Sequence, residues 1–458
     1  MTNTVPSKKP YSLVPLTRVS KKLYGITSLI AVALILVVAL LVPQSAAASP
    51  QMEWSKTYSG DSGDAIQTAD GGYAIAANNG SIMYPAWQRA PMLIKTDSSG
   101  NLQWQKTFNN VGLAGITSIV QTKDGGYVLS GTDISPPISK PVYSGWVIKT
   151  DDKGTVQWNK TVDLPIETCF VIQTSDGGYA LTGYVPNISK GDDGLLVKMD
   201  RQGTTEWNKT FSEGTSKMFI LSMVQSNDTG YVLVGNLDLD GWLAKTDAAG
   251  NLQWTQTYHP SESGSFPLNA VAKTSDGGYI LAGGKLDRGF LVKTDANGNS
   301  QWSREYSECT IVKSVVQTAD GGFIAASALN RQACVIRTDS SGILLYNALY
   351  GEVSGNVSSY ASSVVLTSDG GYAVAGTLNH YSPTTIEGFN VTLTGANSVW
   401  LAKFSAETLA SETNSEPSDP NFEFAALIAV PLLVAAIASV IFYRRKQTKN
   451  SKITLPPL

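Results

Sequence analysis

A short motif recurs seven times along the chain and constrains its fold more than any other feature. The motif is an aspartate, one or two glycines and an aromatic residue, first seen in QTADGGYAIA (67–76), and its copies are 44 to 54 residues apart. Repeats of this length are typical of β-propeller blades. The aspartate and last glycine of each copy are Asp70 and Gly72, Asp124 and Gly126, Asp176 and Gly178, Asp228 and Gly230, Asp276 and Gly278, Asp320 and Gly322, and Asp369 and Gly371.

A second motif, K-T-D-x-x-G-x-x-x-W in most copies, follows the first in each repeat. Between and around the two motifs lie four short stretches rich in β-branched and aromatic residues, for example 118–122, 126–131, 146–150 and 156–162 in the second repeat. Such stretches bounded by Gly and Asp indicate strands. Four strands per repeat and seven repeats predict an all-β, seven-bladed propeller.

The two ends of the array predict how the ring closes. The seventh repeat has a third strand (399–404) but no fourth strand, whereas an additional Trp-containing strand (51–58) precedes the first repeat. We therefore expect the N-terminal strand to complete the last blade, which removes the exposed ends of an open array. The aromatic residues of the seven outer strands, which we expect to dock neighbouring blades, are Trp54, Trp104, Trp158, Trp207, Trp254, Trp302 and Tyr346.

The glycine motif itself is best explained as a hairpin turn. A phosphate-binding loop would lead into a helix and carry Lys and Ser/Thr at fixed spacing, and a catalytic aspartate would not be needed seven times. Thr229 replaces the first glycine of the fourth copy, and β-branched residues rarely adopt positive φ. This comparison predicts a type I turn in which the second glycine, Gly72 and its equivalents, has positive φ.

The D-x-x-G-x-x-x-W motif resembles the tryptophan-docking repeats of the quinoprotein-like propeller superfamily. The whole array (51–404) is similar to secreted prokaryotic cell-surface propeller repeats of the T-x-D-G-G-Y type. The resemblance implies the propeller fold and blades locked by their tryptophans. The spacing from Asp97 to Gly100 is one residue shorter than in the quinoprotein motif, and the adjacent-cysteine pair of the quinone enzymes is missing.

The two ends of the chain indicate export and a membrane anchor. An apolar run (26–42) follows a basic segment and precedes a small-residue cleavage pattern, so 1–48 is a signal peptide or signal anchor. A second apolar run (424–443) is long enough to span a bilayer and is followed by a basic tail (444–458), which predicts a cytoplasmic C-terminus. The propeller (49–404) and a polar stalk (405–423) would then lie outside the cell.

The charge distribution excludes nucleic acid as a partner. The two ends carry ten of the 34 Lys and Arg and none of the 37 acidic residues, so the rest of the chain has a net charge near −13 and repels phosphate backbones. Seven N-x-Ser/Thr triplets agree with an exported glycoprotein. They begin at Asn79, Asn159, Asn187, Asn208, Asn227, Asn356 and Asn390.

Few residues offer catalytic or metal-binding chemistry. The chain has two histidines, His259 and His380, in different repeats, and three cysteines, of which Cys309 and Cys334 are the only sequence-near pair. We therefore predict no metal site, no cofactor and no disulfide framework, and we do not expect a bridge between Cys309 and Cys334. The innermost strands, such as 118–122, offer Ser, Gln and Thr where an enzyme acting in the central channel would need carboxylates.

Recognition is expected on the face opposite the glycine turns. The loops between second and third strands are long in repeats one (78–92), two (132–145) and seven (377–398), which are neighbours once the ring closes. Long loops on a rigid scaffold commonly carry binding sites, although their aromatic residues also pack loops onto blades. Our candidates for binding a surface protein or polysaccharide are Tyr84, Trp87, Arg89, Tyr143, His380, Tyr381 and Phe389. The alternative is an extracellular enzyme with its site in the channel.

Overall fold

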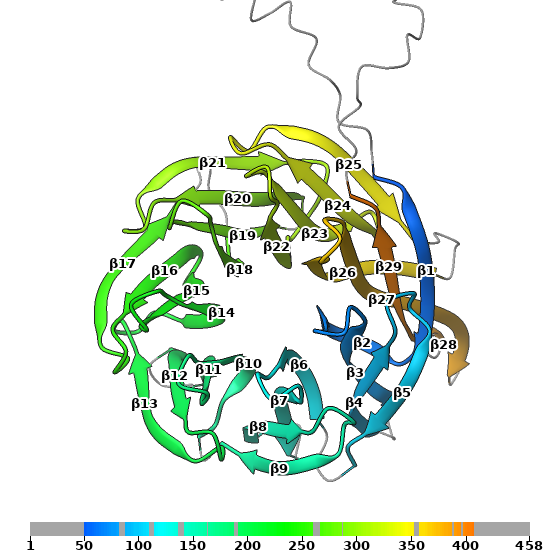
Figure 1. Cartoon of the computed structure of the whole chain (residues 1–458), viewed down its shortest axis with the longest axis horizontal. Coiled ribbons are helices and arrows are strands. Elements are labelled where there is room, and N and C mark those ends of the chain that lie inside the picture. Colours follow the sequence, from blue (N-terminus) through cyan, green and yellow to red (C-terminus); the bar gives the residue numbers. More distant parts are fainter. Residues whose placement is uncertain are drawn as a thin grey trace, which may run out of the picture. The chain divides into compact units, whose positions relative to one another are not determined.

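The computed structural model is a ring of seven antiparallel sheets, which confirms the seven-bladed propeller of four-stranded blades (Figure 1). The structure describes residues 50–81, 88–109, 114–135, 142–162, 164–186, 191–259, 266–285, 287–351, 357–386, 389–394 and 397–406. In blades 1 to 6 the chain runs from the channel outward through four strands that pair in sequence order. The Asp-Gly motifs lie in the tight turns between first and second strands and between third and fourth strands.

The first three blades have the following strands. Blade 1 contains β2 (Asp61–Gln67), β3 (Tyr73–Ser81), β4 (Gln88–Thr96) and β5 (Leu102–Thr107). Blade 2 contains β6 (Ala114–Gln121), β7 (Tyr127–Ser135), β8 (Val142–Thr150) and β9 (Val156–Thr161). Blade 3 contains β10 (Glu167–Gln173), β11 (Tyr179–Val185), β12 (Asp193–Met199) and β13 (Thr205–Phe211).

Blades 4 to 6 repeat this order. Blade 4 contains β14 (Met218–Gln225), β15 (Tyr231–Leu237), β16 (Asp240–Thr246) and β17 (Leu252–Tyr258). Blade 5 contains β18 (Leu268–Lys273), β19 (Tyr279–Lys285), β20 (Arg288–Thr294) and β21 (Ser300–Tyr306). Blade 6 contains β22 (Ser314–Gln317), β23 (Phe323–Leu329), β24 (Gln332–Thr338) and β25 (Leu344–Tyr350).

Blade 7 joins the two ends of the propeller, as the sequence predicts. It contains β26 (Val357–Leu366), β27 (Tyr372–Ile386) and β29 (Ser398–Phe404), and its fourth strand is the N-terminal β1 (Met52–Ser59). Strand β1 pairs with β29 antiparallel, with Tyr58 opposite Val399. The amide of Ser405 donates to the carbonyl of Gln51, which extends this closure by one residue. A further strand, β28 (Phe389–Thr394), pairs only with the outer part of β27.

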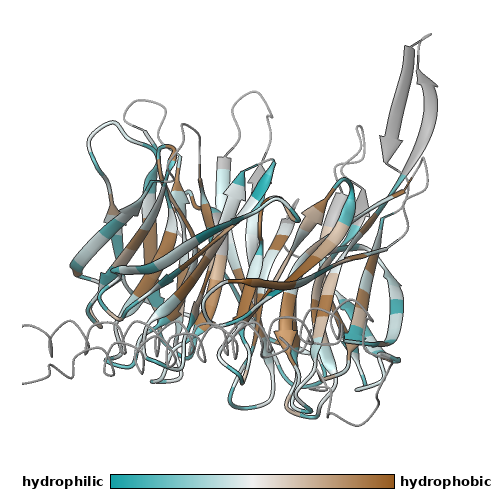
Figure 2. Cartoon of the chain, turned by 90° about the horizontal axis from the view of Figure 1, so that it is seen from above, coloured by the Kyte–Doolittle hydropathy of each residue, from teal (hydrophilic) through white to brown (hydrophobic). Residues whose placement is uncertain are grey.

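The core lies between blades, and this explains the two sequence patterns of the strands. Second and third strands are buried on both faces and read as apolar runs, whereas outer strands alternate between half-buried and exposed residues. Each apolar cluster combines two neighbouring blades; one contains Ile75 and Ile94 of blade 1 with Val399 and Leu401 of blade 7. Figure 2 shows the apolar residues in the middle of the strands and hydrophilic residues toward the turns.

Within the described residues no helix is long and apolar enough to cross a membrane. The apolar runs 26–42 and 424–443, on which the predicted signal segment and membrane anchor rest, lie outside the described residues. The predicted stalk (405–423) is described only for its first two residues.

Candidate binding face

The glycine motif forms a hairpin turn, but the predicted position of its strained residue was wrong. The amide of Gly71 donates to the carbonyl of Thr68 (2.8 Å), the amide of Thr68 donates to the carbonyl of Gly72 (2.9 Å), and φ is +82° at Gly71. The turn is therefore type I followed by a left-handed residue. Positive φ falls on the first position in all seven copies, namely Gly71, Gly125, Gly177, Thr229, Gly277, Gly321 and Gly370. None of the second glycines, Gly72, Gly126, Gly178, Gly230, Gly278, Gly322 and Gly371, has positive φ in the described structure.

The second glycine is required by close packing rather than by its backbone angles. A Cβ at Gly278 would lie 2.1 Å from the carbonyl oxygen of Thr294 and 2.9 Å from Lys293 Nζ, whereas a Cβ at Gly277 has nothing within 4 Å. The prediction was wrong because it assumed that Thr229 has negative φ. Thr229 adopts the left-handed conformation (φ 66°), and its hydroxyl donates to the carbonyl of Asp228. A side chain is sterically admissible at the first position and excluded at the second.

A buried cation beneath each turn explains this packing and was missed from the sequence. Lys245 Nζ donates to Asp228 Oδ2 (2.8 Å), to the carbonyl of Thr246 (2.8 Å) and to Gln253 Oε1 (3.2 Å), and its side chain is 7% exposed. Hydrogen bonds from Lys245 and from the Ser226 hydroxyl hold the pKa of Asp228 at about 2. The same pair occurs in every blade as Lys95–Asp70, Lys149–Asp124, Lys198–Asp176, Lys293–Asp276, Arg337–Asp320 and Lys403–Asp369. The Lys or Arg that begins each K-T-D motif could have indicated this pair from the sequence.

A glutamine before each of five turns links neighbouring blades around the channel. The side chain of Gln121 donates to the carbonyl of Gly125 in its own blade (3.2 Å) and accepts from the amide of Ala69 in the preceding blade (2.8 Å). Across the ring closure, the side-chain oxygen of Gln67 accepts from the amide of Ser368 (2.9 Å). The glutamines that accept from a neighbouring blade are Gln67, Gln121, Gln173, Gln225 and Gln317.

The outer-strand aromatics lie at blade boundaries, where tryptophans cover a left-handed glycine of the next blade. A Cβ at Gly250 would lie 2.6 Å from the Trp207 ring, and that ring meets Tyr231 edge-on at 6.0 Å. The corresponding pairs are Trp54–Gly100, Trp104–Gly154, Trp158–Gly203, Trp254–Gly298 and Trp302–Gly342. At the last boundary Tyr346 has no such glycine, and its hydroxyl lies 3.4 Å from that of Tyr372.

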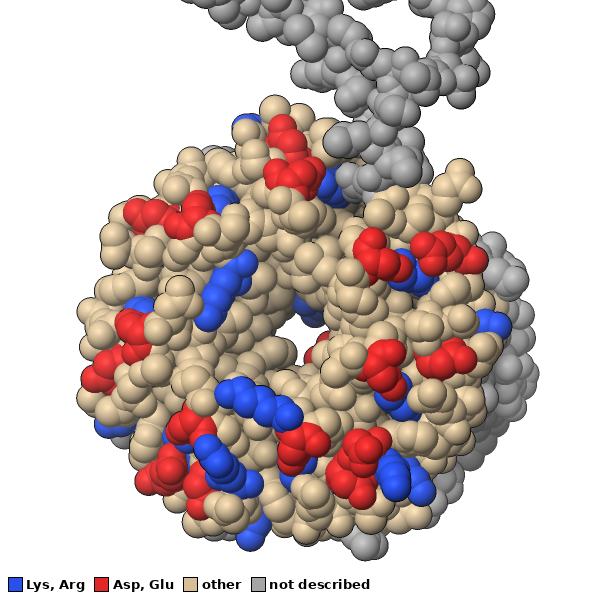
Figure 3. Space-filling view, viewed as in Figure 1, with Lys and Arg blue, Asp and Glu red and all other residues tan. Residues whose placement is uncertain are grey.

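On the face that carries the turns, the polar side chains described above are engaged in contacts within the propeller. The aspartates hold buried cations, the glutamine amides hold neighbouring blades, and the glycines receive tryptophan rings. In the space-filling view, acidic and basic side chains lie in neighbouring groups around the ring, so neither sign dominates the face in view (Figure 3). The described side chains of this face therefore stabilise the turns and join neighbouring blades.

The opposite face carries three extended hairpins in neighbouring blades. In blade 1 the β3–β4 pairing continues to Ser81 and Gln88, in blade 2 the β7–β8 pairing continues to Ser135 and Val142, and in blade 7 β27 and β28 pair out to Ile386 and Phe389. In blades 4, 5 and 6 the corresponding strands end at tight turns, with final pairs Leu237–Asp240, Lys285–Arg288 and Leu329–Gln332. Part of each stretch that the sequence analysis describes as a long loop is therefore paired β-strand.

The candidate residues fall on or beyond these ladders. Tyr143 (β8) lies opposite Ile134 and is half-buried, and His380 (β27) lies opposite Val357 and is also half-buried. The backbones of Arg89, Tyr381 and Phe389 lie in β4, β27 and β28, opposite Gly80, Thr394 and Ile386. Tyr84 and Trp87 lie outside the described residues. The fold brings the three hairpins to neighbouring blades of one face, while His259 lies elsewhere, exposed and bonded to Asp240.

The innermost strands carry few acidic or basic side chains. They are Asp61, Asp64, Glu167 and Lys273. Asp64 accepts from the amides of Ala65 (2.9 Å) and Ile119 (3.4 Å), and burial, only partly offset by its hydrogen bonds, raises its pKa to about 6. Among the described residues, no three His, Cys, Asp or Glu side chains gather as a metal site would require.

Comparisons with known proteins assign the chain to no family and find only distant structural similarity. No family model and no curated protein matches the chain. A protein of unknown function from Dyadobacter fermentans covers 77% of this chain and 99% of its own (8% identity, TM-score 0.46), and a protein from Lactobacillus plantarum covers 69% and 93% (13%, 0.43). Chaetomium thermophilum Sqt1, bound to the N-terminus of ribosomal protein L10, covers 78% and 100% (11%, 0.45). The seven-bladed architecture rests on the strand pairing itself.

Proposed function

We propose that the chain is a membrane-anchored cell-surface propeller that binds a macromolecular partner through its three extended hairpins. The partner is a surface protein or polysaccharide, and the role is adhesion or organisation of the envelope. The observation that carries the proposal is the departure of three neighbouring blades from the repeat on one face only, at β3–β4, β7–β8 and β27–β28. Structural repeats need no such extensions to close a ring, whereas recognition by a rigid scaffold commonly uses them.

The proposed topology rests on the termini of the chain. The apolar run 424–443 with its basic tail supplies the anchor, and the segment 1–48 directs export. Residues 51 and 405 lie side by side at the closure of blade 7.

The test uses the full chain, purified in detergent with its terminal segments, against a glycan array and against biotinylated surface proteins of the producing cell. One variant replaces 80–90 by a tight turn, and another replaces 379–396, just beyond the last β27–β29 pair at Leu378 and Ser398. We expect both variants to keep the β-sheet circular dichroism spectrum and to lose binding. The matched control is Lys153→Ala, an exposed residue in a turn of the opposite face. Binding that survives both replacements would refute the hairpin proposal.

A further inference from the structure

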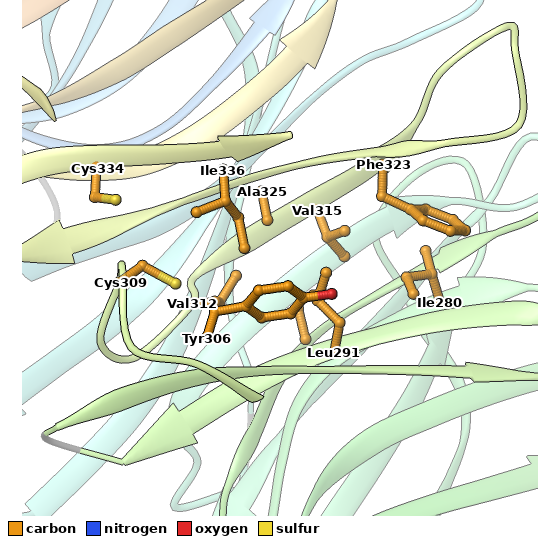
Figure 4. Close-up of a cluster of buried hydrophobic side chains, with 11 residues drawn as sticks. Ile280, Leu291, Tyr306, Cys309, Val312, Val315, Phe323, Ala325, Cys334 and Ile336 are labelled. Carbon is orange, nitrogen blue, oxygen red and sulfur yellow. The ribbon is translucent and has the colours of Figure 1, made fainter. Parts of the chain in front are cut away.

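Two cysteines from different parts of the chain meet in the core between blades 5 and 6. Cys309 lies in the connection from β21 to β22, and Cys334 lies in β24. Both side chains are fully buried in the same apolar cluster, beside Tyr306 and Val312 (Figure 4). The Cys334 thiol donates to the carbonyl of Glu308 (2.9 Å), the residue directly before Cys309, and both cysteines are free thiols.

The backbone on both sides of this contact is held in place. The amide of Gly289 donates to the carbonyl of Cys309 (2.6 Å), and the amide of Thr310 donates to the carbonyl of Ala328 (2.8 Å). Cys334 is in register with Ser327 on one side and Leu349 on the other. The sulfur atom of Cys309 also occupies space that a side chain at Gly289 would fill, since a Cβ there would lie 2.4 Å away. The packing therefore keeps the thiol directed into this site.

We propose that Cys309 and Cys334 form a disulfide when the chain folds in an oxidising environment. The reaction is thiol–disulfide exchange with a small external disulfide such as oxidised glutathione. Each cysteine gives up its proton, the S–S bond of the external disulfide breaks, and that molecule leaves as two thiols that carry the protons and the electron pair. The new bond requires the sulfur atoms to approach to about 2.05 Å from their positions in one buried cluster.

The position of the pair gives the bridge a structural role. Strand β22 has only four residues and is the shortest of the seven innermost strands. The connection that precedes it is therefore anchored mainly by single hydrogen bonds, such as Lys313 amide to Ala326 carbonyl (2.9 Å). A bond from Cys309 to Cys334 ties this connection directly to the third strand of blade 6. Cross-links of this kind stabilise mainly by restricting the unfolded chain.

The surroundings also predict when the bridge forms. The neighbouring Cys334 thiol and burial raise the pKa of Cys309 well above its ordinary range, so the reactive thiolate is scarce once the blade is folded. Exchange is then fast only while the segment is exposed during folding. Afterwards both the bridge and any remaining thiols are shielded, and native protein should resist reductants and alkylating agents alike.

The test is a count of free thiols in the full chain. The protein is refolded in a glutathione buffer, unfolded without reductant in the presence of iodoacetamide, and digested with trypsin. With three cysteines in the chain, a bridge leaves only Cys169 to be alkylated and joins peptide 305–313 to peptide 332–337. Its mass is that of the two peptides less two hydrogen atoms. Three alkylated cysteines and no joined peptide would overturn the proposal.

A matched set of variants checks that the linkage is specific and structural. Cys169→Ala should keep the joined peptide, and Cys309→Ala should abolish it. Reductant applied during refolding should lower the Tm of the wild type by several degrees and leave that of Cys309→Ala unchanged. Equal effects of reductant on both proteins would contradict the structural role. The Tm of the wild type refolded with reductant can also be compared with its Tm without reductant. The test therefore remains valid even if Cys309→Ala folds poorly. None of these readouts depends on the binding partner proposed above.

Discussion

Adjacent glycines in one turn provide the sharpest test of the structure. Gly277 and Gly278 belong to the same hairpin of blade 5, and each is replaced by alanine in turn. Gly277 has φ +84° and open space around a new Cβ. Gly278 has no positive φ, but a Cβ added there would lie 2.1 Å from Thr294 O and 2.9 Å from Lys293 Nζ. The backbone angles alone would make Gly277 the sensitive position. Packing makes Gly278 the sensitive one.

The magnitudes separate the two variants clearly. At Gly277, a left-handed alanine costs about 1–2 kcal/mol, of which about 0.4–1 kcal/mol is offset because alanine also restricts the unfolded chain. The net cost is about 1 kcal/mol. At Gly278, displacing a strand carbonyl costs about 1–3 kcal/mol, and disturbing the hydrogen bonds of a buried ammonium costs about 1.5–3 kcal/mol. The free energy of unfolding should therefore fall by about 3–5 kcal/mol.

Thermal unfolding followed by circular dichroism measures the difference. For the roughly 320 residues that the structure describes, each kcal/mol shifts Tm by about 1–2 °C. We expect Gly277→Ala to lower Tm by about 1 °C and Gly278→Ala by about 4–7 °C, with faster amide exchange of the blade 5 turn in the second variant. The reasoning is refuted if Gly277→Ala is as destabilising as Gly278→Ala, because the strain would then outweigh the contact.

Three further predictions concern Thr229, Asp64 and the turn aspartates. Thr229→Gly should raise Tm by about 1 °C, because it relieves a left-handed β-branched residue; an unchanged or lower Tm would show that the threonine is not strained. Burial raises the pKa of Asp64 to about 6, so its unfavourable charge appears as pH rises from about 4 to 6, and Asp64→Asn should raise Tm at pH 7 and remove this loss. Five turn aspartates have pKa values lowered to about 2, so the stability they contribute is complete above the unfolded pKa of about 3.9 and is lost as pH falls toward 2; a Tm that stays constant from pH 5 to 2 would contradict their pairing. They are Asp70, Asp176, Asp228, Asp276 and Asp369.

The blade count and the ring closure could be predicted because each repeat carries its own local pattern. Turn residues, alternating outer strands and apolar inner strands all recur with the repeat, so seven copies give seven independent indications of one unit. The closure followed from an imbalance between the two ends, namely an extra outer strand at 51–58 and a missing one after 404. Neither inference needs knowledge of which residues touch across blades.

Contacts within the repeat were harder to predict, because they join residues that lie apart in the sequence. The error at Gly72 arose from judging backbone angles alone, when the decisive contacts come from Lys95 and Thr96 on the third strand. The Lys95–Asp70 pair likewise forms only once the hairpins are aligned. A signal was nevertheless present: the second glycine never varies among the seven copies, whereas the first does once. An internally invariant glycine indicates close approach as readily as positive φ.

The same contacts favour the extended hairpins as the place for the binding function that we propose. On the turn face, a change to an aspartate leaves a buried lysine without its partner, a change to a glutamine breaks a link to the next blade, and a change to Gly278 meets the strand backbone. Every such change has a structural cost; the aspartate–cation pair and the second glycine recur in all seven blades, and the glutamine link recurs in five. The ladders of β27 and β28 project beyond these contacts, since β27 leaves β29 after Leu378 and continues with β28 alone. New residues there leave the ring intact, so sequence can vary on that face in response to a partner.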